Sequence, residues 1–233
     1  MVLKVFLFDF NGVIINDERI HKLLIDELIL GENLRATAKD FIEVCLGRSD
    51  RAGLRDLLAR KGRIVTEEYL TKLIIKKAKM YEEKIKGLSS LPVYPDLGEF
   101  LETLRQKEIP MGIVTGALRS EVDLILDKAN IGQYFSVIVA GDDINTSKPQ
   151  PDGYLLAVER FNRWNFNLQL QPSECMAIED TPAGITAAKS AGIPVVGIAH
   201  TYPFHFMQRL SNWAVDNFNQ LDLSYVEQVF SQK

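Results

Sequence analysis

The sequence predicts an α/β fold, a doubly wound parallel sheet with an inserted four-helix cap. Short apolar runs alternate with segments whose apolar residues have helical spacing, which is typical of a parallel sheet with helices on both faces. Residues 18–90 break this alternation, because they show helical spacing and no strand-like run. These two observations together predict a sheet-based core and a separate helical insertion.

The elements of the core follow one another regularly. The strand-like runs are 2–8, 110–115, 136–140, 175–179 and 194–198, with a weaker sixth at 213–215. The helix-like segments between them are 97–107, 121–129, 153–161 and 183–191. In such sheets ligands bind beyond the carboxyl ends of the strands, so the residues that follow each strand are the first to examine.

The insertion predicts helices near 18–30, 37–45, 50–61 and 66–86, with Asp50 capping the third and Thr66 the fourth. Four helices between the first strand and the rest of the sheet form a cap that closes over a ligand. We therefore expect a core of residues 1–17 and 91–233 and a cap of residues 18–90.

Composition excludes several classes of protein. The 233 residues include 27 Lys plus Arg and 31 Asp plus Glu, a net charge of −4, which argues against a nucleic-acid binder. Cys45 and Cys175 have no metal-like spacing, and two cysteines favour a reducing, cytoplasmic location. No run approaches the roughly 20 apolar residues of a membrane span, and the apolar N-terminus favours a strand over a signal peptide.

Polar residues follow four of the predicted strands. Each could have a simple structural role as a turn residue, a helix cap or a solvated lysine, but their combination at one sheet edge indicates a site. Carboxylates suit a hard cation such as Mg2+, lysine and hydroxyl groups suit phosphate oxygens, and a carboxylate can attack phosphorus. The four segments are Asp9-Phe10-Asn11-Gly12, Thr115-Gly116-Ala117, Lys148-Pro149 and Glu179-Asp180-Thr181.

The order of these segments resembles the haloacid dehalogenase superfamily, in its helical-cap branch of beta-phosphoglucomutase and sugar-phosphate phosphatases. The most specific stretch is Ile178 to Gly192, followed by Lys148 to Asp152. The resemblance covers nearly the whole chain and implies a Rossmann-like core.

The resemblance also implies roles for individual residues. Asp9 would be the nucleophile and a Mg2+ ligand, together with the backbone carbonyl of Asn11, Asp180 and Glu179. The phosphoryl group would be held by Thr115 and the N–H groups of Gly116 and Ala117, while Lys148 would neutralise charge. In the cap, the substrate-binding positions implied are Glu18, His21 and Lys77, together with Arg51 of the loop Gly47-Arg48-Ser49-Asp50-Arg51, which resembles the loop that faces the substrate and in which the register of the arginines stays open.

Asn11 departs from the family pattern, in which an aspartate at this position exchanges protons with the leaving group and with water. An amide cannot do so, and the loss of a general acid/base costs roughly 10²–10⁴-fold in rate. Four explanations stay open: an engineered trap, proton transfer by Glu18 or His21, a reaction that needs no acid here, or ligand binding with little turnover. Because glycine follows Asn11, deamidation could also restore a carboxylate.

The leading hypothesis is a Mg2+-dependent phosphohydrolase that acts on a small phosphorylated metabolite of the sugar-phosphate type, as a monomer or small homo-oligomer. A phosphosugar mutase and a low-activity phosphometabolite-binding protein are the alternatives. Residues 18–90 contain 16 basic and 12 acidic residues, a net charge of +4, which leaves −8 for the core. This split favours a small anion held between the two parts.

Overall fold

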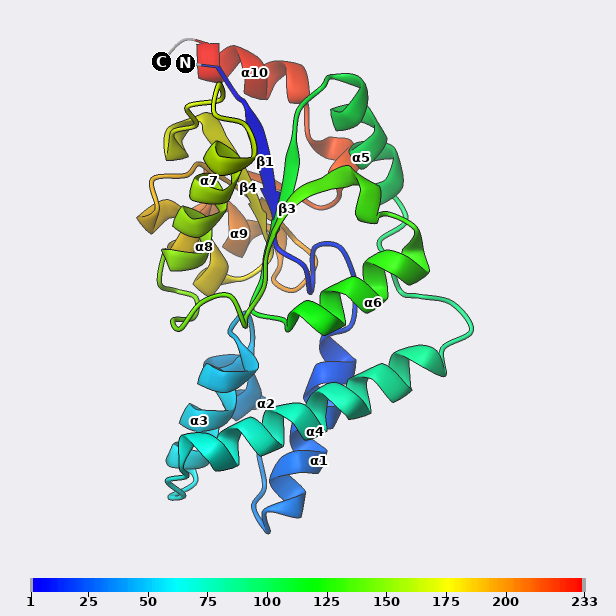
Figure 1. Cartoon of the computed structure of the whole chain (residues 1–233), viewed down its shortest axis with the longest axis vertical. Helices are drawn as coiled ribbons and strands as arrows, with labels where there is room; N and C mark the ends of the chain where they lie inside the picture. Colours follow the sequence, from blue (N-terminus) through cyan, green and yellow to red (C-terminus); the bar gives the residue numbers. More distant parts are fainter. Residues whose placement is uncertain (1, 232–233) are drawn as a thin grey trace.

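The computed structural model describes residues 2–231 and has a six-stranded sheet at its centre (Figure 1). All strand pairs are parallel, in the order β3-β2-β1-β4-β5-β6. This order confirms the predicted doubly wound fold, and the weak sixth run is a strand. The strands are β1 (Val5–Phe8), β2 (Met111–Val114), β3 (Phe135–Val139), β4 (Cys175–Glu179), β5 (Val195–Ile198) and β6 (Trp213–Val215).

Helices cover both faces of the sheet, because alternate residues of each strand point to opposite sides. Phe6 and Phe8 of β1 pack on one face with the apolar residues of α5, α6 and α10, whereas Val5 and Leu7 pack on the other with α7, α8 and α9. These helices are α5 (Leu97–Gln106), α6 (Arg119–Ala129), α7 (Asp152–Trp164), α8 (Pro182–Ser190), α9 (Phe204–Leu210) and α10 (Leu223–Ser231). Short 3-10 turns are η2 (Gly132–Tyr134), η3 (Pro172–Glu174) and η4 (Phe218–Gln220).

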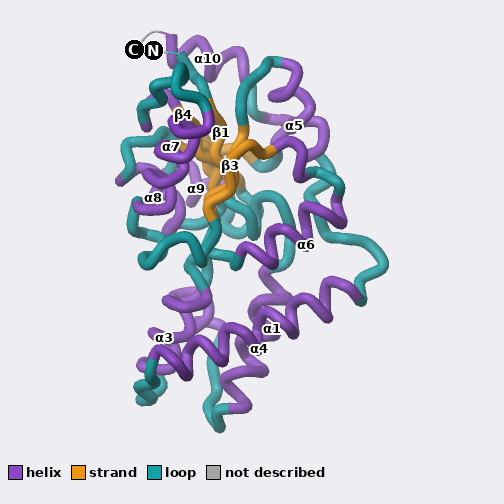
Figure 2. Tube along the Cα trace, in the orientation of Figure 1, coloured by secondary structure: helices purple, strands orange, loops and turns teal. Residues whose placement is uncertain are grey.

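The inserted helices lie at the carboxyl-end edge of the sheet and have an apolar cluster of their own (Figures 1 and 2). They are α1 (Glu18–Gly31), α2 (Ala38–Asp40), η1 (Phe41–Cys45), α3 (Asp50–Arg60) and α4 (Glu67–Lys86). The cluster includes Leu28, Leu54, Leu58 and Leu70, which are nearly or fully buried. The predicted four-helix insertion is therefore present.

Three details differ from the sequence-based expectations. The segment predicted as one helix over 37–45 is a short α-helix that continues into η1, which has π-helical hydrogen bonding. Ser49 caps α3 in place of Asp50, because its side chain accepts a hydrogen bond from the Ala52 N–H at 3.4 Å. Helices α9 and α10 were not predicted. Thr66 does cap α4, as expected.

Among residues 2–231, no helix combines the length and the apolar character that crossing a membrane requires.

Gly112 of β2 is packed closely against a neighbouring strand and a helix. A Cβ at Gly112 would lie 2.8 Å from the Phe161 ring and 3.0 Å from the Val137 carbonyl oxygen. We expect Gly112→Ala to lower the free energy of unfolding by about 1–3 kcal/mol, because overpacking forces strand and helix apart. Urea titration measures the change.

Gly98 provides the matched control. It lies in α5, and a Cβ there would meet nothing within 4 Å. Gly98→Ala should raise the free energy of unfolding by about 0.5–1 kcal/mol, since alanine favours the helix. Equal effects of the two substitutions would contradict this description of the core.

Candidate active site

The carboxylate of Asp9 lies at the end of β1, beside the end of β4. The Asp9 N–H donates to the Ile178 carbonyl at 3.0 Å, which continues the pairing of the two strands. The Lys148 ammonium lies 2.7 Å from Asp9 Oδ1 and 2.7 Å from Glu179 Oε1. Burial opposes the charge of Lys148, but the two carboxylates outweigh it and raise the pKa of the amine. Lys148 therefore joins residues from two strands.

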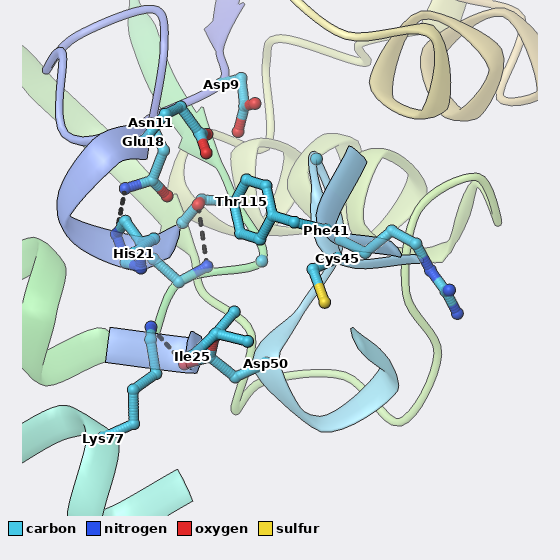
Figure 3. A pocket seen from close by; sticks show the side chains of 14 residues that line it. Asp9, Asn11, Glu18, His21, Ile25, Phe41, Cys45, Asp50, Lys77 and Thr115 are labelled. Carbon is cyan, nitrogen blue, oxygen red and sulfur yellow. Dashed lines mark hydrogen bonds and ion pairs between the residues drawn. The ribbon is translucent and has the colours of Figure 1, made fainter. Parts of the chain in front are cut away.

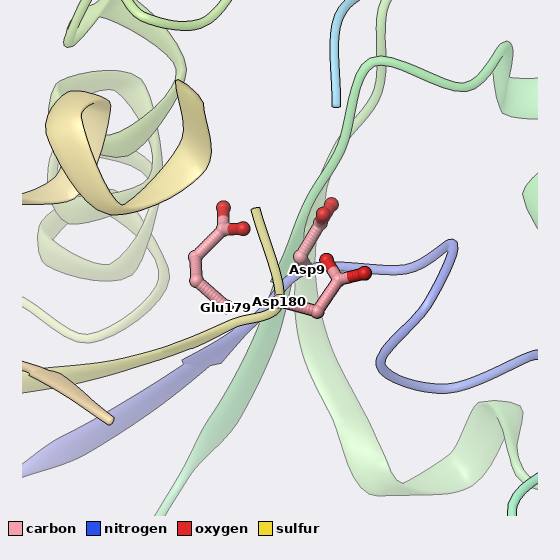
Figure 4. Close-up of side chains that lie close together, drawn as sticks. All are labelled: Asp9, Glu179 and Asp180. Atoms are coloured by element: carbon pink, nitrogen blue, oxygen red, sulfur yellow. The ribbon is translucent and has the colours of Figure 1, made fainter. Parts of the chain in front are cut away.

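Three carboxylates meet at this edge of the sheet (Figure 4). Asp9, Glu179 and Asp180 each offer an oxygen, and these oxygens lie within 4.8 Å of one another. Burial and the neighbouring Asp9 raise the pKa of Glu179 to about 7 and raise the pKa of Asp180 as well. The cluster thus holds more negative charge than the single lysine compensates.

The hydrogen bonds of this cluster leave two buried oxygens free. Glu179 Oε1 also accepts from the Tyr154 hydroxyl at 2.6 Å, and Asp180 Oδ2 accepts from the Thr201 hydroxyl at 2.5 Å. Glu179 Oε2 and Asp180 Oδ1 are buried and find no partner within residues 2–231. Because buried oxygens need a partner and carboxylates suit hard cations, these residues fit a divalent cation.

Two glycines allow the carboxylates to approach the backbone so closely. A Cβ at Gly12 would lie 1.9 Å from Asp180 Oδ2, and Gly12 has φ of +78°, which favours glycine. A Cβ at Gly184 would lie 1.9 Å from Glu179 Oε2. The helix after β4 is capped by Thr181, whose side chain accepts from the Gly184 N–H. Glu179 and Asp180 are therefore not the caps of this helix.

The segment after β2 adds a hydroxyl group next to the inserted helices. Thr115 Oγ1 accepts from the Ala117 N–H at 3.0 Å, so its own hydrogen remains able to donate to a ligand. A Cβ at Gly116 would lie 2.8 Å from the Ser49 nitrogen. The Ser49 N–H in turn donates to Ser147 Oγ at 2.8 Å. The loop before α3 therefore packs directly against the core.

The Asn11 side chain is held by a buried network that the sequence did not predict. Its Nδ2 lies 3.0 and 3.1 Å from the two oxygens of Asp17 and 3.0 Å from His21 Nε2. Asp17 is fully buried and also accepts from the Tyr81 hydroxyl at 2.5 Å. Burial alone would raise the pKa of Asp17, but His21 and these hydrogen bonds lower it. Asp17 therefore acts as an ionised acceptor that fixes the amide.

A cavity of about 40 Å³ lies between the core and the inserted helices (Figure 3). It collects most of the predicted site residues: Asp9, Asn11, Glu18, His21, Lys77, Thr115, Gly116 and Ala117. The other lining residues are Gly47, Arg48 and Asp50, which belong to the loop that the resemblance places facing the substrate, and Ile25, Phe41 and Cys45, which the sequence did not indicate. Lys148, Glu179 and Asp180 surround Asp9 without lining this cavity.

Arg51 is not brought into this cavity. Its guanidinium pairs with Glu67 at 2.9 Å and with the Thr71 hydroxyl at 3.1 Å, facing a separate groove of about 440 Å³. Arg48 lines the cavity in its place, three residues earlier. The sequence left the register of these arginines open, because both lie in one polar loop-to-helix segment.

The other missed residues have weak signals in the sequence. Tyr154 contacts the acidic cluster from α7, two residues beyond the Lys148 to Asp152 stretch, and Thr201 contacts it from the loop after β5, outside the stretches that carry the resemblance. Asp17 precedes α1 and looks like an ordinary cap, although its side chain makes no capping bond there. Only the strand-end position after β5 could have directed attention to Thr201.

The fold and the carboxylates at the strand ends indicate an α/β enzyme. Comparison with known proteins shows the family to which it belongs. The family model of haloacid dehalogenase-like hydrolases matches residues 3–192. The chain therefore belongs to this family of hydrolases.

Individual relatives agree with this assignment. The chain is 29% identical over 205 residues to validoxylamine A 7'-phosphate phosphatase of Streptomyces hygroscopicus subsp. limoneus, covering 85% of this chain and 87% of that protein. It is 34% identical over 112 residues to phosphoglycolate phosphatase of Escherichia coli strain K12, covering 48% of this chain and 42% of that enzyme. The crystal structure of beta-phosphoglucomutase from Clostridium difficile has a TM-score of 0.84 at 23% identity and covers 100% of this chain and 98% of that chain, which shows a shared fold.

The Glu18 carboxyl makes folding stability depend on pH. Burial raises its pKa from 4.5 to about 7, so the folded chain binds this proton more tightly than the unfolded chain. Its stabilising contribution is complete below pH 4.5 and is lost as the pH rises towards 7. Glu18→Gln should flatten this decline in the free energy of unfolding, measured in a chelating buffer. Glu27→Gln, on the exposed face of the same helix, should leave the decline as it is; equal profiles for both variants would contradict the assignment.

Asn11 should keep its amide while the chain is folded. Deamidation requires the Gly12 nitrogen to attack the Asn11 side chain, but the Gly12 N–H donates to the Ile15 carbonyl at 2.8 Å and Asp17 holds the amide. Peptide mapping of aged samples should find conversion to aspartate in urea-unfolded protein and little in folded protein. Equal conversion in both samples would show that the network does not protect this residue.

Proposed function

We propose that the chain is a Mg2+-dependent phosphohydrolase that acts on a small phosphorylated metabolite of the sugar-phosphate type. One observation carries the proposal: the buried Asp9 carboxylate contacts Lys148, faces the Glu179–Asp180 pair, and opens onto a cavity between core and cap. Both curated relatives described above are phosphatases by name, which supports the same chemistry.

In this proposal Asp9 acts as the nucleophile. One of its oxygens attacks phosphorus, the bond from phosphorus to the ester oxygen breaks, and the phosphoryl group is transferred to Asp9. Water then attacks phosphorus, the bond to Asp9 breaks, and inorganic phosphate leaves. Thr115, with the N–H groups of Gly116 and Ala117, holds the phosphoryl oxygens, and Lys148 balances charge on Asp9.

The metal ligands in this proposal are Asp9, the backbone carbonyl of Asn11, Asp180 and Glu179. Bound Mg2+ would neutralise phosphoryl charge, as in other phosphoryl transfers. The free oxygens of Glu179 and Asp180 support this ligand set.

Proton transfer is assigned to Glu18, because Asn11 cannot exchange a proton. Glu18 lines the cavity with Asp9, and its pKa of about 7 suits a group that gives and takes a proton near neutral pH. His21 lines the same cavity, but it is engaged with Asp17 at 3.3 Å and stacked on Tyr81. Asn11 donates hydrogen bonds and supplies its backbone carbonyl.

We further propose that residues 18–90 act as a cap on a core of residues 1–17 and 91–233. The separate apolar cluster of the inserted helices and the contact from Ser49 to Ser147 support this division. A cavity of about 40 Å³ is too small for a sugar phosphate. The cap must therefore open to admit the substrate and close to exclude water.

The test is phosphate release from a panel of sugar phosphates with and without Mg2+. Release should need Mg2+ and fall to background in Asp9→Asn, because the nucleophile is lost. Glu18→Gln should lower kcat by about 10²–10⁴-fold, because it removes the group to which proton transfer is assigned.

Asp123→Asn removes a surface carboxylate on α6 that pairs with Arg119, and it should leave release unchanged. Activity that persists in Asp9→Asn would overturn the nucleophile assignment. An isomerised sugar phosphate without net phosphate release would indicate a mutase instead.

A further inference from the structure

The wall of the cavity opposite Asp9 contains a buried ion cluster formed by three helices. Lys77 of α4 is fully buried, and its ammonium lies 2.6 Å from Asp50 Oδ2 of α3 and 3.4 Å from Glu121 Oε1 of α6. Figure 3 shows Lys77 and Asp50 facing one another below the cavity. The Lys77 ammonium is thus paired with two carboxylates, so the cluster has no unpaired positive charge that could bind a ligand.

The other basic side chains on this wall also have acidic partners, although the partner of Arg48 is half exposed. Arg48 Nη2 lies 2.6 Å from Asp56, and Arg48 Nη1 donates to the Val44 carbonyl at 2.9 Å. His21 lies 3.3 Å from the Asp17 carboxylate. In the described part of the chain, each basic side chain that lines the cavity therefore has an acidic partner, and one buried donor, Arg48 Nε, makes no hydrogen bond.

The remaining lining groups favour a ligand whose part beyond the phosphoryl group is uncharged and carries hydroxyl groups. The carboxylates of Glu18 and Asp50 can accept hydrogen bonds from hydroxyl groups. Ile25, Phe41 and Cys45 provide an apolar surface for the carbon skeleton. A second anion would meet these carboxylates or would have to displace one from a buried cation, and like charges so placed oppose binding strongly.

We infer that the substrate is a phosphate monoester whose remaining part carries hydroxyl groups and no second anionic group. This inference rests on the proposed function, in which the phosphoryl group lies at Asp9. It excludes phosphorylated carboxylic acids and sugar bisphosphates as preferred substrates. It also favours a phosphatase over a mutase, because a mutase must hold a bisphosphate.

Matched pairs of compounds test the inference. Glycerol 3-phosphate is compared with 3-phosphoglycerate, and glucose 6-phosphate with glucose 1,6-bisphosphate, each by kcat/KM with Mg2+ present. The same pairs are compared by calorimetric binding to Asp9→Asn, so that the preference is measured without turnover. The member of each pair that lacks a second anionic group should be favoured by at least about tenfold.

Asp50→Asn should narrow this preference by about tenfold, because it leaves Lys77 with more positive charge for an anion. Glu67→Gln removes the same charge from the cap, but Glu67 pairs with Arg51 and Arg55 outside the cavity. It should leave the preference unchanged. If Asp50→Asn does not fold, the preference of the unchanged protein is decisive alone.

The outcomes separate the two proposals. A preference for the anionic members, or equal shifts in Asp50→Asn and Glu67→Gln, overturns the inference about the substrate and leaves the phosphohydrolase intact. An absence of both turnover and binding for all four compounds overturns the proposed function and this inference with it.

Discussion

The contact of one lysine with two carboxylates from neighbouring strands is the constraint on which the site depends. Asp9 and Glu179 end β1 and β4, which pair directly, and Lys148 reaches both at 2.7 Å. Without this ammonium, buried carboxylates so close together would repel one another. The same cluster requires glycine at two positions of the backbone, because Gly12 lies against the Asp180 carboxylate and Gly184 against the Glu179 carboxylate.

Charge pairing also governs the opposite wall. The sequence indicated a basic insertion over an acidic core, which suggested that cap cations meet an anionic ligand. In the structure the buried Lys77 is shared between Asp50 of the insertion and Glu121 of the core. Excess positive charge in the cap is thus a property of its surface, while the cavity wall is compensated internally. In the proposed function, core residues recognise the phosphoryl group, and the cavity wall recognises the rest of the ligand through hydrogen-bond acceptors and apolar side chains.

The sequence predicted those parts of the fold that depend on local pattern. Buried strands such as Val5–Phe8 have continuous apolar runs, and the polar residues that follow them are easily found. The segment that forms α10 also has apolar residues at helical spacing, Leu223, Val226 and Phe230, but no strand follows it to complete the alternation. Helix α9 buries only Met207, which is too little for a periodic signal.

Contacts between distant segments could not be predicted from the sequence. Tyr81 and Asp17 are 64 residues apart, and Lys77 and Glu121 are 44 apart. Which arginine faces the cavity depends on the loop that begins at Gly47, where a Cβ would lie 2.5 Å from Thr181 Oγ1. Such packing decides whether a basic residue is available to a ligand or already neutralised, and residue type alone does not.

The most direct test of the central claim is to look for the phosphoryl group on Asp9. The protein is incubated with Mg2+ and a sugar phosphate, quenched in acid and mapped by mass spectrometry. A phosphoryl adduct on the peptide containing Asp9 is predicted, and it should persist longer in Glu18→Gln than in the unchanged protein, because Glu18→Gln removes the group to which proton transfer is assigned. An adduct on another residue, or sustained Mg2+-dependent phosphate release without any adduct under rapid quenching, would contradict the account.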